Sequence, residues 1–316
     1  MAQVSIIMAA YNAQSFVHQA ITSLLEQTLT DFELIVVDDA STDATVSQIE
    51  VIQDDRIKLI KLKSNGGVSV ARNRALLECT APYVAIMDAD DISSPDRLEK
   101  QINYLNVHSE VVAVGSWLYL MSPSGKQIHM DRSPPTSAIQ VMADLFEFGG
   151  GVFPGTVIMR TDAVQKIGGY REVFPSSEDL DLLLRMTQFG TVANIPEALY
   201  GYRLNPNGIT FSSKARRDHY AQQALALWRE RQSRGSDSLD DGSTLTDLSV
   251  SQGSGGESKY DLKQVLSYFY RQDALQKIKS GHKWDGIVSL AYAFFHQPTE
   301  RKNWVFFVKV ILRKDI

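Results

Sequence analysis

Three carboxylates stand within four residues at Asp88, Asp90 and Asp91, directly after the apolar segment Tyr83–Met87. Because like charges repel, such a cluster needs a cation or solvent to compensate it. Hard oxygen ligands suit Mg²⁺ or Mn²⁺, whose coordination shells are commonly completed by water and substrate phosphates. The cluster therefore indicates a divalent-metal site, and the alternative is a solvated acidic loop.

A second acidic pair, Asp38 and Asp39, follows the segment Glu33–Val37, which is rich in branched residues. A carboxylate can accept hydrogen bonds from the imide of a uracil-like base or from ribose hydroxyls. Acidic residues before Ser41 can equally cap the next helix. The pair predicts either a nucleoside contact or a helix cap.

A third acidic pair, Glu178 and Asp179, opens a predicted helix over Glu178–Gln188. Backbone N–H groups and the helix dipole favour negative charge at this end, so capping accounts for the pair. The other interpretation makes Asp179 a general base that takes a proton from an attacking hydroxyl.

Two arginines, Arg72 and Arg74, follow the turn Asn65–Gly67. A guanidinium can bind phosphate oxygens in a fixed geometry. Glycines in the turn would let the backbone approach a ligand closely. The alternative is that both arginines solvate the outer face of a helix.

The first hundred residues alternate between strand and helix patterns. This alternation predicts a mostly parallel sheet with helices on both faces, in which ligands bind at the carboxyl ends of the strands. The Asp38 and Asp88 groups both stand at such ends. The expected strands are Val4–Ala9, Glu33–Val37, Ile57–Leu62 and Tyr83–Met87, and the expected helices are Ala13–Gln27, Thr45–Ile52 and Val68–Glu78.

The remainder predicts a mixed region and then a helical tail. Residues 235–258 are rich in Ser, Gly and Asp, with no Lys, Arg, Pro or aromatic residue, which is typical of a flexible linker. We expect a domain over 1–215, a connecting helix over 216–234, this linker, and a tail over 259–316. Further expected elements are strands at Val111–Leu120 and Thr156–Arg160, and helices at Ala138–Phe146, Leu262–Ile278, Trp284–Phe295 and Asn303–Leu312.

Charge and cysteine content limit the binding partners and the cellular compartment that we expect for the protein. A net charge of −5 lacks the basic excess of nucleic-acid binders, and Cys79, the only cysteine, excludes an intramolecular disulfide. With no secretion signal at the N-terminus, we expect a cytoplasmic protein. The tail carries 11 Lys and Arg against 5 Asp and Glu. Its segment Trp304–Leu312 predicts either contact with the inner membrane face or packing on protein.

Six short motifs, in this order along the chain, resemble glycosyltransferase family 2. The resemblance covers about residues 1–213 and leaves the tail outside. The motifs are Val4–Asn12 (VSIIMAAYN), Val36–Asp43 (VVDDASTD), Asn65–Asn73 (NGGVSVARN), Asp88–Asp91 (DADD), Gly168–Tyr170 (GGY) and Glu178–Arg185 (EDLDLLLR).

The resemblance implies a GT-A type nucleotide-binding domain: an α/β fold with a mixed, mostly parallel central sheet flanked by helices. It also implies a metal-dependent, inverting enzyme. Such an enzyme moves a hexosyl or N-acetylhexosaminyl group from a nucleotide-diphosphate donor to a hydroxyl of a glycan or a lipid-linked acceptor. Uridine is the favoured nucleoside, and Mn²⁺ or Mg²⁺ the expected cofactor.

Carried over by position, the resemblance makes Ala10, Tyr11 and Asp39 contacts to the nucleoside, with Asp39 at the base. It makes Arg72 a further nucleotide-side contact. Asp88 resembles the member of its motif that faces the ribose or the sugar.

The same comparison gives the metal to Asp90 and leaves Asp91 to support the loop. Asp179 resembles the catalytic base of the family, with Glu178 beside it. Arg185, further along the same helix, is expected to hold the local geometry.

One position departs from the family pattern. Many relatives carry Tyr, Arg, any residue and His in a later stretch, whereas Tyr202–Leu204 is followed here by Asn205. An amide offers a weaker contact than the imidazole, so we assign no further metal or phosphate ligand.

Two other functions remain open from the sequence. A noncatalytic module that binds sugar nucleotides or scaffolds glycan assembly would not need the acidic groups, which are all present. A nucleotidyltransferase usually has a Gly-rich phosphate loop near the N-terminus, and Ala9–Asn12 has no glycine.

Overall fold

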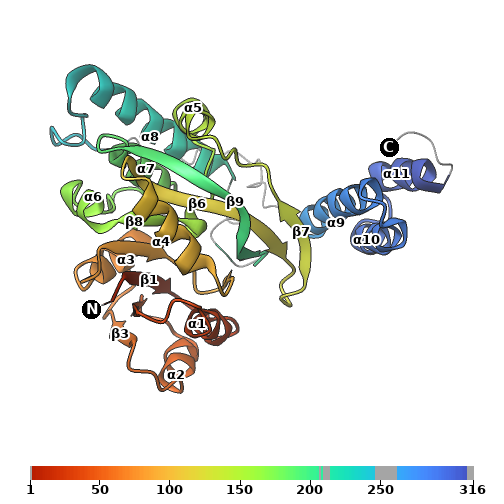
Figure 1. Cartoon of the computed structure of the whole chain (residues 1–316), viewed down its shortest axis with the longest axis horizontal. Coiled ribbons are helices and arrows are strands. Elements are labelled where there is room, and N and C mark those ends of the chain that lie inside the picture. The colour runs from red at the N-terminus through yellow and green to blue at the C-terminus, as the bar shows by residue number, and fades with distance from the viewer. Residues whose placement is uncertain (1, 206–207, 209–213, 246–261, 312–316) are drawn as a thin grey trace, which may run out of the picture. The chain divides into compact units, whose positions relative to one another are not determined.

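The computed structural model describes residues 2–205, 208, 214–245 and 262–311 (Figure 1). Its N-terminal part is a parallel sheet centred on β1, which pairs with β2 on one side and β4 on the other, while β3 pairs with β2. Parallel neighbours need crossover connections, which the helices supply. In chain order the elements are β1 (Val4–Ala10), α1 (Val17–Leu25), β2 (Phe32–Asp38), α2 (Thr45–Glu50), β3 (Ile57–Lys61), α3 (Val68–Leu76) and β4 (Tyr83–Ile86).

The sheet continues with strands of opposite direction. β8 is antiparallel to β4 and to β6, and β5 is antiparallel to β9. The order is β3-β2-β1-β4-β8-β6-β9-β5, with β7 paired to β6. The predicted mixed, mostly parallel α/β architecture is confirmed. These elements are β5 (Ile92–Ser93), α4 (Arg97–Val107), β6 (Val111–Met121), β7 (Gln127–Asp131), α5 (Ala138–Phe148), η1 (Pro154–Thr156), β8 (Ile158–Arg160), α6 (Thr161–Lys166), α7 (Glu178–Met186), β9 (Thr191–Arg203) and α8 (Lys214–Arg234).

Successive side chains of β1 point to opposite faces of the sheet, and both faces are buried. Ile7 lies in an apolar cluster with Ala71 and Ala75 of α3, whereas its neighbours Ile6 and Met8 are buried on the opposite face. The two alanines present only methyl groups to the strands, so α3 can approach closely. This approach brings Arg72, between them in sequence, to the carboxyl end of the sheet.

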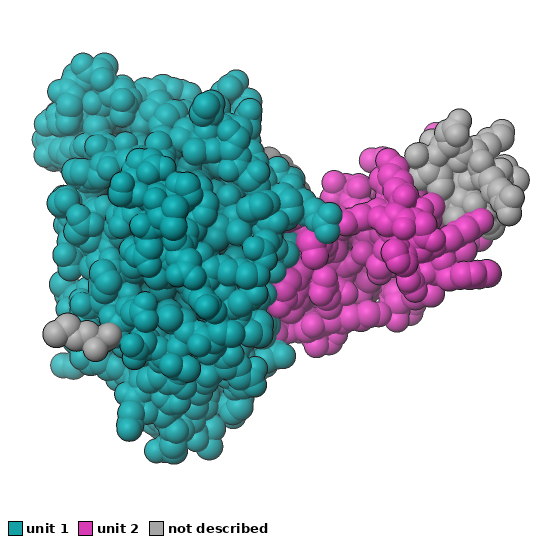
Figure 2. Space-filling model, in the orientation of Figure 1, with its two compact units in different colours: residues 1–118, 132–202, 215–253 teal, residues 119–131, 203–214, 254–316 magenta. Residues whose placement is uncertain are grey.

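The chain divides into two compact units (Figure 2). Unit 1 contains residues 1–118, 132–202 and 215–253, and unit 2 contains residues 119–131, 203–214 and 254–316. Within unit 2, α9 (Leu262–Lys279) packs against α10 (Lys283–His296) and β7, and α11 (Arg301–Ile311) packs against α10. Among the described residues, no helix has the length and apolar character needed to cross a membrane.

The expected division of the chain differs from these units. The predicted connecting helix, α8, packs Tyr220, Ala224 and Leu227 into the core cluster of unit 1. The predicted linker starts with an ordered turn, in which Asp237 is 1% exposed and bonded to two arginines. Composition did not predict this ordered turn, because Asp237 is held by ion pairs, which a Ser-, Gly- and Asp-rich composition does not reveal. The rest of the predicted linker, 246–258, lies outside the described residues.

Candidate active site

Arg72 joins two of the predicted acidic groups. Its Nη2 donates to Asp88 Oδ1 at 3.0 Å, and its Nη1 lies 2.8 and 2.9 Å from the two carboxylate oxygens of Asp179. Nη1 also lies 3.1 Å from Glu178 Oε1. Residues that stand about ninety positions apart in the sequence therefore converge on one guanidinium, at the end of β4 and the start of α7.

Tyr170 completes the surroundings of Asp179. Its hydroxyl donates to Asp179 Oδ1 at 3.1 Å, and its ring lies against the guanidinium of Arg72. The backbone of Tyr170 is held by Asn73, which accepts from its N–H at 2.8 Å and donates to its carbonyl at 2.9 Å. The Asp179 carboxylate is thus oriented from two sides, by α3 and by the segment before α7.

One cation among three carboxylates leaves the cluster with excess negative charge. Burial, together with the nearby charge of Asp179, raises the pKa of Glu178 to about 7, although Arg72 opposes the shift. Burial alone would lower the pKa of Arg72, but its carboxylate partners raise it well above its ordinary value. At neutral pH the Arg72 guanidinium is therefore always charged, whereas the Glu178 carboxyl can gain or lose a proton.

The three aspartates of the turn after β4 differ in how far their side chains are exposed. Asp88 is about one-third exposed, and its backbone N–H donates to the Tyr200 hydroxyl at 3.2 Å. Asp90 is half-buried, whereas Asp91 is 1% exposed. A methyl group on Gly155 would stand 3.0 Å from Asp88 Oδ2, so a glycine leaves room for that carboxylate.

A cage of three protein carboxylates is not formed at this turn. Across the described part of the chain, no three His, Cys, Asp or Glu side chains gather in a way that would hold a metal ion. The half-buried Asp90 and the partly exposed Asp88 fit a site in which ligand oxygens and water supply most of the coordination shell. The buried Asp91 is placed to support the turn.

The end of β2 forms a second part of the site. Asp39 is 3% exposed, and its two carboxylate oxygens accept the N–H groups of Gly66 and Gly67 at 2.8 Å each. Gly67 has a φ of 88°, which favours glycine. Asp38 is also 3% exposed: its Oδ2 accepts the Ser41 N–H at 3.1 Å, and its buried Oδ1 has no hydrogen-bond partner among the residues that the structure describes.

The helix-cap explanation of this pair does not hold. α2 begins at Thr45, and its N–H is accepted by Asp43 instead. Ala10, the last residue of β1, accepts the Asp39 N–H at 2.8 Å, and Tyr11 beyond it is half-exposed. The strand ends therefore bring Ala10, Tyr11 and the Asp38–Asp39 pair together.

Arg74 and Arg185, the two remaining arginines named from the sequence, lie away from the acidic groups at Arg72. Arg74 pairs with Glu78 on the outer face of α3, so the solvated-face interpretation applies to it. Arg185 is 5% exposed and donates to Asp181 and to the carbonyls of Ile167 and Gly169, each at 2.8 Å. It contacts none of the acidic groups at Arg72, in keeping with a role in local geometry.

Sequence reasoning missed several residues that shape the site. Tyr170 lies in a motif that was recognised, but nothing in the motif assigns its hydroxyl to Asp179. Tyr200 and Gly155 lie on β9 and η1, far from the acidic motifs in sequence, and no signal points to them. Ser177, just before α7, has a left-handed φ of 61°, and its hydroxyl donates to the Arg217 carbonyl.

Similar proteins agree on the kind of enzyme. The family model described as glycosyl transferase family 2 matches residues 5–168, slightly more than half of the chain. The putative glycosyltransferase EpsE of Bacillus subtilis is 36% identical over 208 residues, covering 64% of this chain and 73% of EpsE. The amylovoran biosynthesis glycosyltransferase AmsE of Erwinia amylovora is 30% identical over 233 residues, covering 71% of this chain and 84% of AmsE.

Solved structures agree on the fold. S. aureus TarS (residues 1–349) in complex with UDP-GlcNAc matches with a TM-score of 0.57 and 18% identity, covering 94% of this chain and 92% of that one. The complex with UDP matches with a TM-score of 0.54. The overall arrangement is the GT-A type. With this fold, the family match and these relatives, the chain belongs to glycosyl transferase family 2 and is a glycosyltransferase.

Proposed function

We propose that this enzyme moves a sugar, with inversion, from a UDP-sugar to a hydroxyl of a glycan or lipid-linked acceptor. The observation that carries the proposal is the contact of Arg72 with both Asp88 and Asp179, at 3.0 and 2.8 Å. This contact sets a donor-side carboxylate and a candidate base on either side of one cation. A sugar held between them would have its leaving group and its attacking hydroxyl on opposite sides.

Asp179 acts as the general base in this account. A hydroxyl that attacks the anomeric carbon must lose its proton in the transition state, and a positioned carboxylate can accept it. Tyr170 and Arg72 orient the carboxylate of Asp179, so little of its side-chain freedom remains to be lost during the reaction. Glu178, with its raised pKa, can take up a proton and so reduce the negative charge of the cluster.

The donor nucleoside is assigned to the ends of β1 and β2. The motif places Asp39 at the base, but both oxygens of that carboxylate accept N–H groups of the Gly66–Gly67 turn. The buried Asp38 Oδ1, which has no hydrogen-bond partner among the described residues, is better suited to the imide N–H of uracil. Asp39, the next residue, holds the Gly66–Gly67 turn in place. The half-exposed ring of Tyr11 offers a face on which the base can stack. TarS has been solved with UDP and with UDP-GlcNAc, which supports uridine as the nucleoside.

The acceptor belongs to a polysaccharide or its lipid-linked precursor. Relatives are named for amylovoran and O-antigen biosynthesis, as in AmsE and in WbnJ of Escherichia coli, the latter 32% identical over 208 residues. An oligosaccharide acceptor presents several hydroxyls, so the position of Asp179 would select which one reacts.

Asp90 would hold Mg²⁺ or Mn²⁺ together with donor phosphates. When bound, the ion supplies positive charge that stabilises the departing nucleotide diphosphate. Asp90→Asn is expected to abolish metal-dependent UDP-sugar binding in calorimetric titrations while the thermal unfolding curve stays unchanged. Asp96→Asn, on a surface-exposed aspartate that pairs with Lys100, is the matched control. Full turnover by the Asp90 variant in a chelator would contradict the metal assignment.

Unit 2 suggests a second property, contact with an anionic lipid surface. Residues 304–311 of the predicted segment lie on α11, and Leu312 lies outside the described residues. A described exposed face is on α10. There Trp284 and Phe295 are 80% and 81% exposed, with Val288 between them at 56%. These positions share one face of the helix. Lys126, which is exposed and precedes β7, lies over the ring of Tyr292 of α10. The exposed Lys283 directly precedes Trp284 in the chain. Exposed aromatic residues with neighbouring cations suit a membrane interface.

A further inference from the structure

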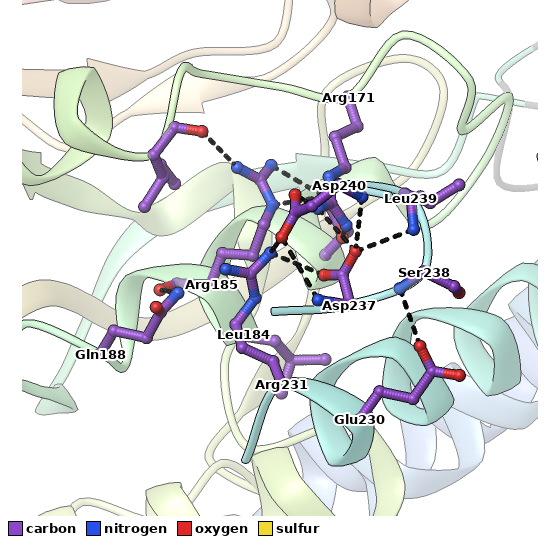
Figure 3. Close-up of polar contacts among 12 residues, drawn as sticks. Arg171, Leu184, Arg185, Gln188, Glu230, Arg231, Asp237, Ser238, Leu239 and Asp240 are labelled. Carbon is purple, nitrogen blue, oxygen red and sulfur yellow. Dashed lines mark hydrogen bonds and ion pairs between the residues drawn. The ribbon is translucent and has the colours of Figure 1, made fainter. Parts of the chain in front are cut away.

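A turn after α8 joins the segment that carries Tyr170. Asp237 accepts from Arg171 at 2.9 Å through Oδ1 and from Arg231 at 2.7 Å through Oδ2. Asp240 lies 2.6 Å from each of the same two arginines. Figure 3 shows both aspartates between the two guanidinium groups. We call Arg171, Arg231, Asp237 and Asp240 the arginine–aspartate clasp.

The clasp is charged, and its centre, Asp237, is buried. Asp237 is 1% exposed, and the side chains of Arg171 and Arg231 are 15% and 13% exposed. Although burial raises the pKa of Asp237, its hydrogen bonds to the two arginines lower it overall. The turn also closes on itself, because the N–H groups of Leu239 and Asp240 donate to Asp237 Oδ1. Charge and backbone geometry thus fix this turn together.

The clasp is continuous with the contacts that hold Asp179. Arg171 also reaches Asp181, at 3.4 Å, on the first turn of α7. Asp181 binds Arg185, whose guanidinium holds the carbonyls of Ile167 and Gly169. Tyr170 lies between Gly169 and Arg171 and donates to Asp179.

The segment between α6 and α7, residues 167–177, forms no helix or strand. Gly168 and Gly169 have φ values of 74° and 72°, which favour glycine, and their N–H groups donate to carbonyls at the end of α6. Side chains hold the residues that follow. Asn73 anchors Tyr170 from one side, and the clasp anchors Arg171 from the other. If the clasp is lost, Tyr170 keeps its two hydrogen bonds to Asn73 on α3, but Arg171 and the rest of the segment before α7 lose this anchor.

We propose that Asp237 and Asp240 are positioning residues for Asp179, acting through Arg171 and the segment 167–177. This inference rests on the proposed base role of Asp179. Both residues lie beyond the family-model match, which ends at residue 168, so a segment outside that match sets the geometry of the reaction.

Asp237→Asn in the full chain tests this inference. The variant keeps the size of the side chain but removes the charge that balances two guanidinium groups. We expect kcat for sugar transfer to fall between about 10- and 100-fold, the range that small misplacements of catalytic groups produce. The donor KM should stay within about twofold, because the contacts of Asp237 are with Arg171 and Arg231 and not with the residues assigned to the nucleoside. Amide hydrogen exchange should speed up over 168–181.

Two further variants separate positioning from folding. Glu230→Gln is the matched control, because Glu230 accepts the Ser238 N–H of the same turn without touching Arg171, and glutamine keeps an acceptor there. Its kcat should equal that of the wild type. Asp240 is 39% exposed, so Asp240→Glu can keep both ion pairs, and it should retain kcat where Asp240→Asn loses it. If Asp237→Asn does not fold, comparison of Asp240→Glu with Asp240→Asn tests the inference.

Wild-type kcat in folded Asp237→Asn and Asp240→Asn would overturn the positioning role. A fall in kcat shared equally by Glu230→Gln would overturn it as well, since that result means general loosening of the turn. If the wild type transfers sugar and Asp179→Asn does not, a failed clasp test leaves the proposed function standing. If Asp179→Asn retains transfer, the proposed function itself fails.

Discussion

At the scale of single residues, the site depends on the balance between Arg72 and three carboxylates. One guanidinium cannot neutralise Asp88, Glu178 and Asp179 together. Burial, with the nearby charge of Asp179, raises the pKa of Glu178 to about 7. A donor diphosphate would bring more negative charge, which the cation proposed at Asp90 would offset. Protonation of Glu178 is the alternative way in which the protein alone reduces this charge.

Glu178→Gln tests this balance through pH. Because the folded-state pKa of Glu178 lies above its ordinary value, the wild type binds more protons folded than unfolded between about pH 4.5 and 7. Its stability should therefore fall across that window relative to the glutamine variant. The difference should reach on the order of 1 to 3 kcal/mol of unfolding free energy. Urea unfolding of both proteins from pH 5 to 8 measures it, and parallel pH profiles would contradict the charge balance.

Residue types and spacing point to the acidic groups but not to their partners. Crowded carboxylates at strand ends are visible in the sequence, since their chemistry is local. The contact of Arg72 with Asp179 depends on how α3 packs against α7, which no local pattern encodes. Arg72 and Arg74 are indistinguishable in sequence, and only burial on one side of α3 separates them.

At the scale of elements, α3 positions both sides of the site. It carries Arg72 toward the carboxylates and Asn73 toward the backbone of Tyr170. The helix can do this because Ala71 and Ala75 let it lie close to β1 and β2. The segment before α7 is thereby fixed from a helix about a hundred residues earlier.

Asn73→Ala tests the role of α3. The variant removes two hydrogen bonds to the Tyr170 backbone, and unfolding free energy should fall by about 2 kcal/mol. Sugar transfer should fall further than stability accounts for, because the Tyr170 hydroxyl then no longer orients Asp179. Asn106→Ala removes a similar side-chain bond, to Tyr83, and is the control. Equal transfer rates in the two folded variants would refute the anchoring role.

The alternation of strands and helices predicted β1 to β4 and α1 to α3 within a few residues, because their apolar periods are regular. The later strand β9 was missed: it contains Pro196 and Gly201, which normally argue against a strand. Pro196 is exposed, where a missing N–H costs little. α4 was also missed, since its buried face includes the polar Arg97 and Gln101, held by backbone carbonyls.

At the scale of the whole molecule, the chain combines a GT-A unit with a helical unit of basic composition. The predicted helices of the tail are confirmed at α9, α10 and α11. Its grouping with residues 119–131 was not predictable, because burial of Ile128 on that hairpin depends on tertiary packing.

Replacing Trp284 and Phe295 by serine tests the lipid contact of unit 2. Each change removes an exposed aromatic side chain without opening the core, so binding to anionic vesicles should fall by about tenfold per residue. Ile139→Ser, at an exposed apolar position on α5, should bind as the wild type does. Cosedimentation with vesicles containing or lacking anionic lipid measures this. Equal binding by all three variants would exclude the α10 face.

The most direct test of the central claim is Asp179→Asn, measured for donor binding and for sugar transfer in parallel. The amide keeps the size of the side chain but cannot take up the proton of the acceptor. We predict a UDP-sugar dissociation constant within about twofold of the wild type and a transfer rate about 10³-fold lower. Transfer at the wild-type rate would contradict the account, since Asp179 would then not be the base.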